Sequence, residues 1–323
     1  MLIDPRMTAP MVGPPERSAI HWRGAPPVAC RRWCLALLLL GPLVTVHCGC
    51  WNAGGKSGEP QSIIRVEGSD TMVNIAQAWA ERYHAARPDV SVQVLGGGSG
   101  VGIASLTDGN CSMANSSRDI NENEAQAIRS KRGADPQEHI VGYDALAVYV
   151  HPSNPIESIS LDELAEIFGA GGATTRWPQL GVAFQSRGHD VIVRVGRQNS
   201  SGTYVYFREA VLDKKRDFKL GSVDRSGSKD VVALVSHTPL AIGYSGMGYA
   251  TPDVKMLRVS KHKGEPGVAP TVENARNRRY PLTRSLQIYT VGAPAAAVAK
   301  YLDWIMSPEG QQIVVELGYV PAQ

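Results

Sequence analysis

Short runs rich in β-branched residues alternate with amphipathic stretches along the chain from Ile63 onward. Residues 63–66 read Ile-Ile-Arg-Val, a composition typical of a strand. Beyond them, apolar residues recur at intervals of three and four, which predicts one buried face of a helix: Met72, Ile75, Ala76, Trp79 and Tyr83. Pro88 ends this predicted helix, because proline cannot continue a helix, and residues 90–94 predict a second strand.

The alternation continues to the C-terminus and predicts an α/β fold. The first unit adds a helix over 100–106, a strand end at 113–114 and a helix near 123–132. A second unit begins near Asp144, with strands over 145–150, 191–195 and 241–244 and helices over 161–168, 203–212 and 230–235. The tail predicts helices over 295–306 and 308–317.

This order of elements is typical of two lobes, each a mostly parallel sheet with helices on both faces. Ligands of such open sheets bind at the carboxyl ends of the strands, so we expect a ligand cleft between the lobes. We assign residues 62–143 and 243–323 to lobe 1, and residues 144–242 to lobe 2.

The N-terminal region has the pattern of an export signal. Arg31 and Arg32 precede an apolar stretch over 35–46, which is shorter than the roughly 20 residues that a membrane-spanning helix needs. A basic flank followed by a short apolar run is typical of a secretory signal. The alternative, a buried core helix, is disfavoured because Pro42 interrupts the stretch. We therefore interpret residues 1–49 as an N-terminal extension and signal segment.

Cys50 follows the apolar run and precedes a polar stretch, an arrangement that resembles a bacterial lipoprotein junction. Gly49 supplies the small residue expected before the modified cysteine, whereas His47 and Cys48 depart from the usual pattern. We interpret residues 50–61 as a lipid-anchor cysteine and flexible tether, which predicts an exported protein held at the membrane by its lipid. Four of the five cysteines lie in or beside the signal, so no disulfide framework is predicted, and Cys111 is expected to be a small buried residue.

The composition excludes several classes of partner. The 323 residues are 43% hydrophobic and 20% charged, as in ordinary globular proteins. A formal charge of +3 is too small to predict nucleic-acid binding or a polybasic membrane patch. The eight histidines lack metal-ligand spacing, and the glycine runs match neither a phosphate loop nor a dinucleotide fingerprint. We therefore predict no nucleic-acid partner, no metal and no cofactor.

Four segments share one design, in which a strand is followed by a tight polar turn and the start of a helix. They are Gly68-Ser69-Asp70-Thr71-Met72, residues 96–102 (Gly-Gly-Gly-Ser-Gly-Val-Gly), Asn115-Ser116-Ser117-Arg118 and residues 197–203 (Arg-Gln-Asn-Ser-Ser-Gly-Thr). The start of a helix presents unpaired N–H donors and the positive end of the helix dipole, which favour an anion. For any one of Ser69, Ser99 and Ser201 taken alone, a helix cap is the better explanation. Four such segments together, two of them with an arginine, predict an oxyanion site.

These segments, in this order, resemble the phosphate-binding periplasmic proteins of phosphate ABC importers, which are type II periplasmic binding proteins. The resemblance covers residues 62–323, and its most specific part is Ser201-Gly202-Thr203 followed by residues 204–207 (Tyr-Val-Tyr-Phe). Residues 241–244 are similar to the strand by which such proteins return to the first lobe.

The resemblance implies a binding protein, not an enzyme, whose two hinged lobes close on inorganic phosphate and deliver it to a membrane permease. The implied donors are the hydroxyls of Thr71, Ser99, Ser117, Ser201 and Thr203, the Arg197 guanidinium, and the N–H groups of Met72 and Gly202. We add their neighbours to the predicted site: Ser69, Asp70, Gly100 and Arg118.

One departure concerns the acceptor that separates hydrogen phosphate from sulfate. Some family members have an aspartate where this chain has Ser117, and that carboxylate accepts the proton of the ligand. Asp70 is a candidate for the same task, and the alternative interpretation is that it caps a helix. Both interpretations stay open. A surface ion pair is likewise the alternative for Arg197.

Two other functions remain open at this stage. An exported phosphatase would use one of the loop serines as nucleophile, although Asp70 is the sole general base that the sequence places near them. Residues 97–101 also fail the nucleophile-elbow pattern, because Val101 replaces the second glycine. A binding protein of the same fold for sulfate or another oxyanion is the second alternative.

Overall fold

The computed structural model describes residues 62–184, 190–214 and 216–322. The predicted signal segment, Cys50 and the tether lie outside these residues. The first elements are β1 (Ser62–Gly68), α1 (Val73–Ala86), β2 (Val90–Leu95), α2 (Ser99–Asp108), β3 (Met113–Ser116) and α3 (Glu122–Arg132). Asn121 and Glu124 form a capping box at the start of α3, which fixes where this helix begins.

The middle of the chain contains most of the short elements. They are β4 (Pro136–Val150), β5 (Ser158–Ser160), α4 (Leu161–Phe168), the 3₁₀ helix η1 (Trp177–Leu180), β6 (Val193–Arg197), α5 (Gly202–Val211), β7 (Val223–Arg225), α6 (Ser228–Ser236), β8 (Ala241–Gly246), the 3₁₀ helix η2 (Met247–Tyr249), β9 (Lys255–Met256), β10 (Arg258–Ser260) and α7 (Val272–Arg276). The last elements are β11 (Thr283–Val291), α8 (Ala296–Ile305), α9 (Pro308–Glu316) and β12 (Val320–Pro321).

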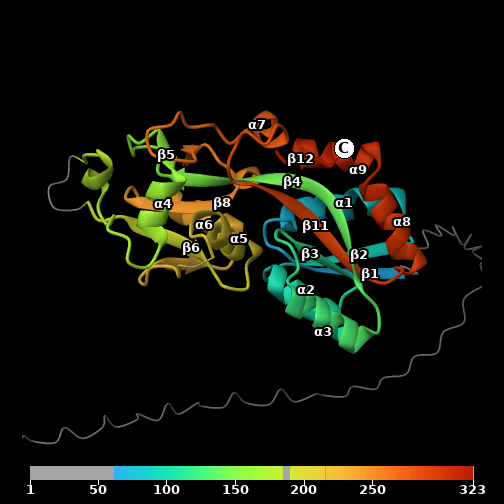
Figure 1. Cartoon of the computed structure of the whole chain (residues 1–323). Coiled ribbons are helices and arrows are strands. Elements are labelled where there is room, and N and C mark those ends of the chain that lie inside the picture. The colour runs from blue at the N-terminus through green and yellow to red at the C-terminus, as the bar shows by residue number, and fades with distance from the viewer. Residues whose placement is uncertain (1–61, 185–189, 215, 323) are drawn as a thin grey trace, which may run out of the picture. The chain divides into compact units, whose positions relative to one another are not determined.

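The main sheet has the strand order β2-β1-β3-β11-β4-β8-β6-β7. Strands β2, β1 and β3 are parallel, and so are β8, β6 and β7. Between these two groups, β11 and β4 run antiparallel to each other and to their outer neighbours. Figure 1 shows β4 and β11 side by side, with β4 as one long strand. The predicted α/β fold is therefore confirmed, and the antiparallel pair in its middle was not predicted.

Two large groups of buried apolar residues pack on either side of this pair. The first core gathers residues of β1, α1, β11, α8 and α9, including Ile64, Trp79, Leu286, Tyr301 and Val314. The second core gathers residues of the later half of β4 with α4, β6, α5, α6 and β8, including Val148, Phe168, Phe207, Val231 and Tyr244. A smaller third core joins α2, β3 and α3 through Ile103, Ala114 and Ile128.

The predicted return to the first lobe near Ile242 differs from the observed pairing. Strand β8 pairs with the later half of β4 and with β6, so it stays with the second core. The segment after β8 also packs there, through Leu257, Val259, Tyr280 and Leu282. The chain crosses back along β11, which begins at Thr283. The boundary at residue 243 therefore divides one packed unit, whereas the crossing near Asp144 coincides with the point where β4 changes partners from β11 to β8.

Among the described residues, no helix is both long and apolar enough to cross a membrane. Cys111 is buried, as expected, and the pKa of its thiol is raised by that burial.

Candidate functional site

Seven of the predicted site residues are buried polar side chains that meet where β1, β3 and β6 end. They are Ser69, Thr71, Ser99, Ser117, Arg197, Ser201 and Thr203, and we call them the polar cluster. Buried polar groups cost free energy unless they are hydrogen-bonded, so a cluster of this size requires a network of partners or a bound ligand.

The hydroxyls of the polar cluster bond across long distances in the sequence. Ser69 Oγ donates to Ser117 Oγ at 2.9 Å, and the Ser117 N–H donates to Ser99 Oγ at 3.1 Å. Thr71 Oγ1 and Thr203 Oγ1 lie 2.9 Å apart, although the two residues are separated by 132 positions. All four predicted segments thus converge at the cluster.

The start of α5 contributes the fourth segment. Ser201 is the N-cap of α5, and its Oγ accepts from the Thr203 N–H at 3.1 Å. Gly202 faces the opposite loops so closely that a Cβ atom there would lie 2.3 Å from Ser99 Oγ and 2.7 Å from Ser117 Oγ. Glycine at this position lets the first turn of α5 approach the hydroxyls of α2 and β3.

Ser99 plays a different part from Ser201. The N-cap of α2 is Gly98, and no side chain caps this helix. Because Ser99 Oγ accepts from Ser117, the cap interpretation is confirmed for Ser201 and wrong for Ser99. The loops before α2 and α5 also touch directly, since the Gly100 N–H donates to the Ser200 carbonyl at 3.0 Å and Ser200 Oγ donates to the Gly97 carbonyl at 3.2 Å.

Arg197 is buried, with 1% of its surface exposed, so the alternative of a surface ion pair is wrong. Its Nη2 donates to Asp70 Oδ2 at 3.0 Å, and its Nη1 donates to Ser228 Oγ at 3.0 Å. Nε and Nη2 also donate to the Ser226 carbonyl, at 3.2 and 2.7 Å. Burial lowers the pKa of the Arg197 guanidinium, and the Asp70 carboxylate opposes that shift.

Asp70 is not a helix cap. The N-cap of α1 is Met72, which receives no side-chain cap bond. Asp70 Oδ1 instead accepts from the Gly97 N–H at 2.9 Å, while Oδ2 accepts from Arg197. A carboxylate has about four lone-pair sites, so two remain beyond these bonds. The role of Asp70 as an acceptor for a ligand stays a prediction.

Three predicted site residues are bonded elsewhere. Arg118 pairs with Glu124 through two bonds of 2.8 and 2.7 Å and donates to the Asp119 carbonyl, so its guanidinium does not join the polar cluster. The Met72 N–H donates to the Ser69 carbonyl at 2.9 Å, and its side chain packs in the first core. The Gly100 N–H is likewise bonded to Ser200, as described above.

A second buried ion pair, which the sequence did not indicate, lies against the cluster. Arg284 on β11 donates to Asp144 Oδ2 on β4 through Nε at 3.1 Å and Nη2 at 2.8 Å. Burial raises the pKa of the Asp144 carboxyl, and the Arg284 guanidinium opposes that shift. Arg284 also donates to the hydroxyls of Thr71 and Thr203. No motif surrounds either residue, and their only sequence signal is one charge within a strand-like run.

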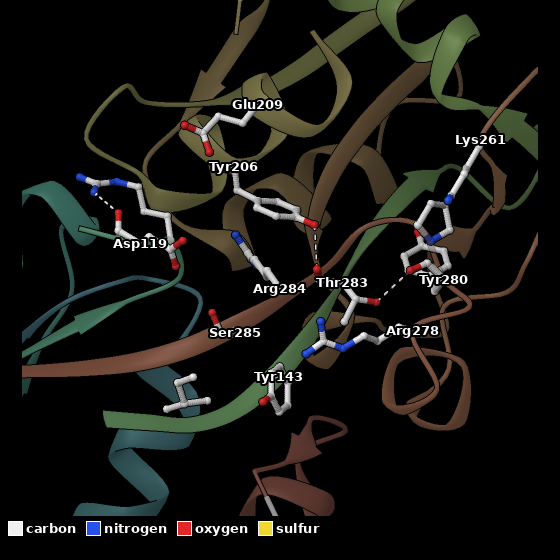
Figure 2. Close-up of a pocket in the computed structure, with 13 residues that line it drawn as sticks. Asp119, Tyr143, Tyr206, Glu209, Lys261, Arg278, Tyr280, Thr283, Arg284 and Ser285 are labelled. Atoms are coloured by element: carbon white, nitrogen blue, oxygen red, sulfur yellow. Dashed lines mark hydrogen bonds between the residues drawn. The ribbon is translucent and has the colours of Figure 1, made fainter. Parts of the chain in front are cut away.

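A cavity of about 480 Å³ lies on the other side of Arg284. Figure 2 shows Arg284 in its wall, beside Tyr206, whose hydroxyl donates to the Thr283 carbonyl at 2.9 Å. The Tyr206 ring lies 5.6 Å from the Arg284 guanidinium carbon, within the range of a cation–π contact. The polar cluster itself does not line this cavity; Arg284 separates the two.

The cluster offers little for catalysis. Each described hydrogen bond of the Asp70 carboxylate runs to Gly97 or Arg197 and not to a serine hydroxyl. In the described residues, no histidine is hydrogen-bonded to a serine of the cluster, and His139, for example, pairs with Thr290. Over the same ranges, no group of three or more His, Cys, Asp or Glu residues is arranged to hold a metal ion. The described residues thus bring together neutral donors and two ion pairs.

Comparison with known proteins gives a consistent result. The family model described as the PBP superfamily domain matches residues 55–309. The phosphate-binding protein PstS of Pseudomonas aeruginosa is 36% identical over 279 residues, covering 83% of this chain and 84% of that protein. PstS of Bacillus subtilis is 30% identical, covering 88% and 92%.

Solved structures agree in fold. A Clostridium perfringens protein with bound phosphate superposes with a TM-score of 0.71 at 27% identity, covering 81% of this chain and 100% of that one. An ABC-type phosphate transport receptor from Vibrio cholerae gives a TM-score of 0.62 at 27% identity, covering 80% and 99%.

Proposed function

The chain belongs to the PBP superfamily and, within it, to the phosphate-binding periplasmic proteins, and we propose that it captures inorganic phosphate and delivers it to the membrane permease of an ABC importer. The observation that carries this proposal is the polar cluster, in which hydroxyls from four segments converge on the starts of α2 and α5. We assign ligand contacts to Thr71, Ser99, Ser117, Arg197, Ser201, Gly202 and Thr203.

The electrostatics of the cluster suit a dianion held by neutral donors together with one charged donor, Arg197. Arg197 is paired with Asp70, and Arg284 with Asp144, so the two cations are balanced by two carboxylates. The anion would therefore be stabilised by hydroxyls, N–H groups, the Arg197 guanidinium and the positive ends of α2 and α5. Closing such a site removes water, which strengthens each of these interactions.

The two cores support a hinged mechanism in which β4 and β11 form the connection. Closure would bring Gly98 and Gly100 against Ser200, the contacts present in this structure. We propose that phosphate leaves when these contacts open. Solution scattering should then give a smaller radius of gyration with phosphate than without it, and identical profiles would contradict the hinge.

For localisation we propose export, cleavage before Cys50 and lipidation of that residue, on the sequence pattern alone. The lipid would hold the protein at the outer face of the cytoplasmic membrane, near its permease.

One experiment separates binding from catalysis. Equilibrium dialysis of the purified protein against labelled phosphate measures binding, and incubation with a chromogenic phosphomonoester measures turnover. The proposal predicts saturable binding of one phosphate per chain and no released product. Release of product at a rate that depends on a cluster serine would favour the phosphatase instead.

A further inference from the structure

Arg284 and Asp144 face each other on neighbouring antiparallel strands, because the register of β11 and β4 pairs these two positions. Both side chains are almost completely buried, with 2% and 0% exposure. Asp144 Oδ1 accepts from the Met247 N–H at 3.2 Å, so each carboxylate oxygen has a partner. A buried ion pair contributes to a fold only when such extra bonds satisfy its remaining groups.

The donors that Arg284 does not give to Asp144 point at the polar cluster. Nη1 donates to Thr203 Oγ1 at 2.9 Å, and Nη2 donates to Thr71 Oγ1 at 3.1 Å. Thr71 follows β1, beside the first core, and Thr203 belongs to α5, which packs in the second core. One guanidinium thus holds a hydroxyl from each side of the β4–β11 pair.

The guanidinium restricts the directions in which the two threonine hydroxyls can donate. A threonine hydroxyl has one hydrogen to donate and two lone pairs, whereas a guanidinium can only donate. Each threonine oxygen accepts from Arg284, and one of the two hydroxyl hydrogens is used in the bond between Thr71 and Thr203. The other hydrogen cannot turn toward the guanidinium and is directed to an acceptor elsewhere in the cluster.

We infer that Arg284, held by Asp144, is a positioning residue that leaves the Thr71–Thr203 pair with one hydroxyl hydrogen to donate to the bound oxyanion. This inference rests on the proposed function and extends it to two residues that contact the ligand only through others. The carboxylate is needed to hold the guanidinium, and the guanidinium is needed to mask the carboxylate.

The position of Asp144 explains why the guanidinium is needed to mask the carboxylate. A Cβ atom placed on Gly246 would lie 2.9 Å from Asp144 Oδ2 and 3.2 Å from Thr71 Cγ2, so the carboxylate and this threonine flank the same point. Without Arg284, the Thr71 hydroxyl can turn to donate to Asp144, because a charged acceptor makes the stronger hydrogen bond. The ligand then loses a donor and faces an unmasked negative charge.

The test is a double-mutant cycle on phosphate affinity. The background is the double substitution Arg284→Gln with Asp144→Asn, which removes both charges together and leaves no orphaned ion. This variant should bind phosphate at least about 10-fold more weakly than the parent. Thr203→Val should weaken binding about 10-fold in the parent but less than about 3-fold in the double variant, since the hydroxyl is no longer held as a donor.

Ser99→Ala is the control, because no hydrogen bond joins Ser99 to Arg284 or Asp144, and its effect should be the same in both backgrounds. Arg284→Lys is a second variant that keeps the charge opposite Asp144. The lysine ammonium lacks the fixed fork with which the guanidinium reaches three groups. The Arg284→Lys variant should therefore stay folded and bind phosphate more weakly than the parent. Unfolding midpoints are recorded for every variant.

The outcomes are distinct. Additive effects of Thr203→Val, or full affinity in Arg284→Lys, would overturn the positioning role while leaving phosphate binding by the parent intact. If the parent binds sulfate and not phosphate, the proposed function fails. The positioning role is then tested by measuring the sulfate affinities of the same variants. A parent that binds neither anion overturns both.

Discussion

Gly202→Ala is the substitution that addresses the site most cleanly, because it adds one methyl group where the two halves of the cluster meet. The new Cβ would lie 2.3 Å from Ser99 Oγ, 2.7 Å from Ser117 Oγ and 3.0 Å from Ser99 Cβ. Ordinary contacts are near 3.4–4 Å, so the start of α5 must move back by about 1 Å. Gly202 begins α5 with no positive φ, so alanine is compatible with its backbone.

The expected loss of phosphate-binding free energy follows from the contacts that this shift of α5 breaks. Overpacking of this kind costs about 1–3 kcal/mol, and a neutral hydrogen bond lost between ligand and hydroxyl costs about 0.5–1.5 kcal/mol. Together they predict a loss of roughly 2–4 kcal/mol, or about 30- to 1,000-fold in affinity. The unliganded fold should be little affected, because the proposed opening of the lobes relieves the contact and alanine is the better helix former by up to about 1 kcal/mol.

Titration calorimetry gives the phosphate affinity, and a thermal unfolding curve on the same preparation gives the unfolding midpoint. Gly102→Ala is the matched control: its Cβ would lie 2.4 Å from the Glu67 carbonyl oxygen and 2.5 Å from Gly68 Cα, backbone atoms of the neighbouring strand. It should lower the unfolding midpoint, whereas Gly202→Ala should lower affinity alone. Parent-like phosphate affinity in Gly202→Ala would refute the placement of the ligand between α2 and α5.

Four further predictions concern single residues. Arg197→Ala should weaken phosphate binding by about 2–5 kcal/mol, against roughly 0.5–1.5 for Ser201→Ala, because it removes a charged donor and leaves Asp70 unpaired beside the anion; equal affinities by calorimetry would place the site elsewhere. Asp70→Asn should lower the ratio of phosphate to sulfate affinity by about 10-fold or more, since a carboxylate acceptor rejects sulfate; an unchanged ratio in competition titrations would exclude Asp70 as that acceptor. Cys111 should resist iodoacetamide in the folded protein and react once it is unfolded, because burial raises its pKa; peptide mass spectrometry that finds it labelled under native conditions would contradict this. Cys50→Ala should release the exported protein from the membrane fraction, and an intact mass without lipid on the parent would count against the anchor.

The local elements were predictable because their signals are local. The buried face of α1 was evident from the spacing of Ile75, Trp79 and Tyr83, all of which are buried. The turns with serine and glycine identified the polar cluster in the same way, since strand ends and helix starts are encoded within a few residues. Six elements of the first unit follow the predicted order.

The long-range pairings were not predictable in this way. Strand β11 lies beside β4 although more than 130 positions separate their ends, and no local pattern states which strands are neighbours. For the same reason the sequence predicts the return of the chain at residues 241–244, which form β8, because a strand's own sequence does not distinguish one sheet neighbour from another.

The positions of buried charged residues are even harder to predict from local sequence, because they depend on a partner that is distant in the sequence. Asp144 begins a buried run and Arg284 occupies an unremarkable strand position, and each is tolerated there only because the other lies opposite. Arg118 shows the converse: its place after the Ser116-Ser117 turn favoured a ligand contact, but Glu124 at the start of α3 binds it.

The central claim is that the polar cluster holds inorganic phosphate, and a calorimetric titration of the purified protein with phosphate, arsenate and sulfate in turn tests it most directly. The account predicts one site per chain for phosphate, comparable binding of arsenate, whose geometry and protonation are similar, and sulfate weaker by at least about 10-fold. Absence of heat with phosphate, or sulfate binding as tightly as phosphate, would contradict it.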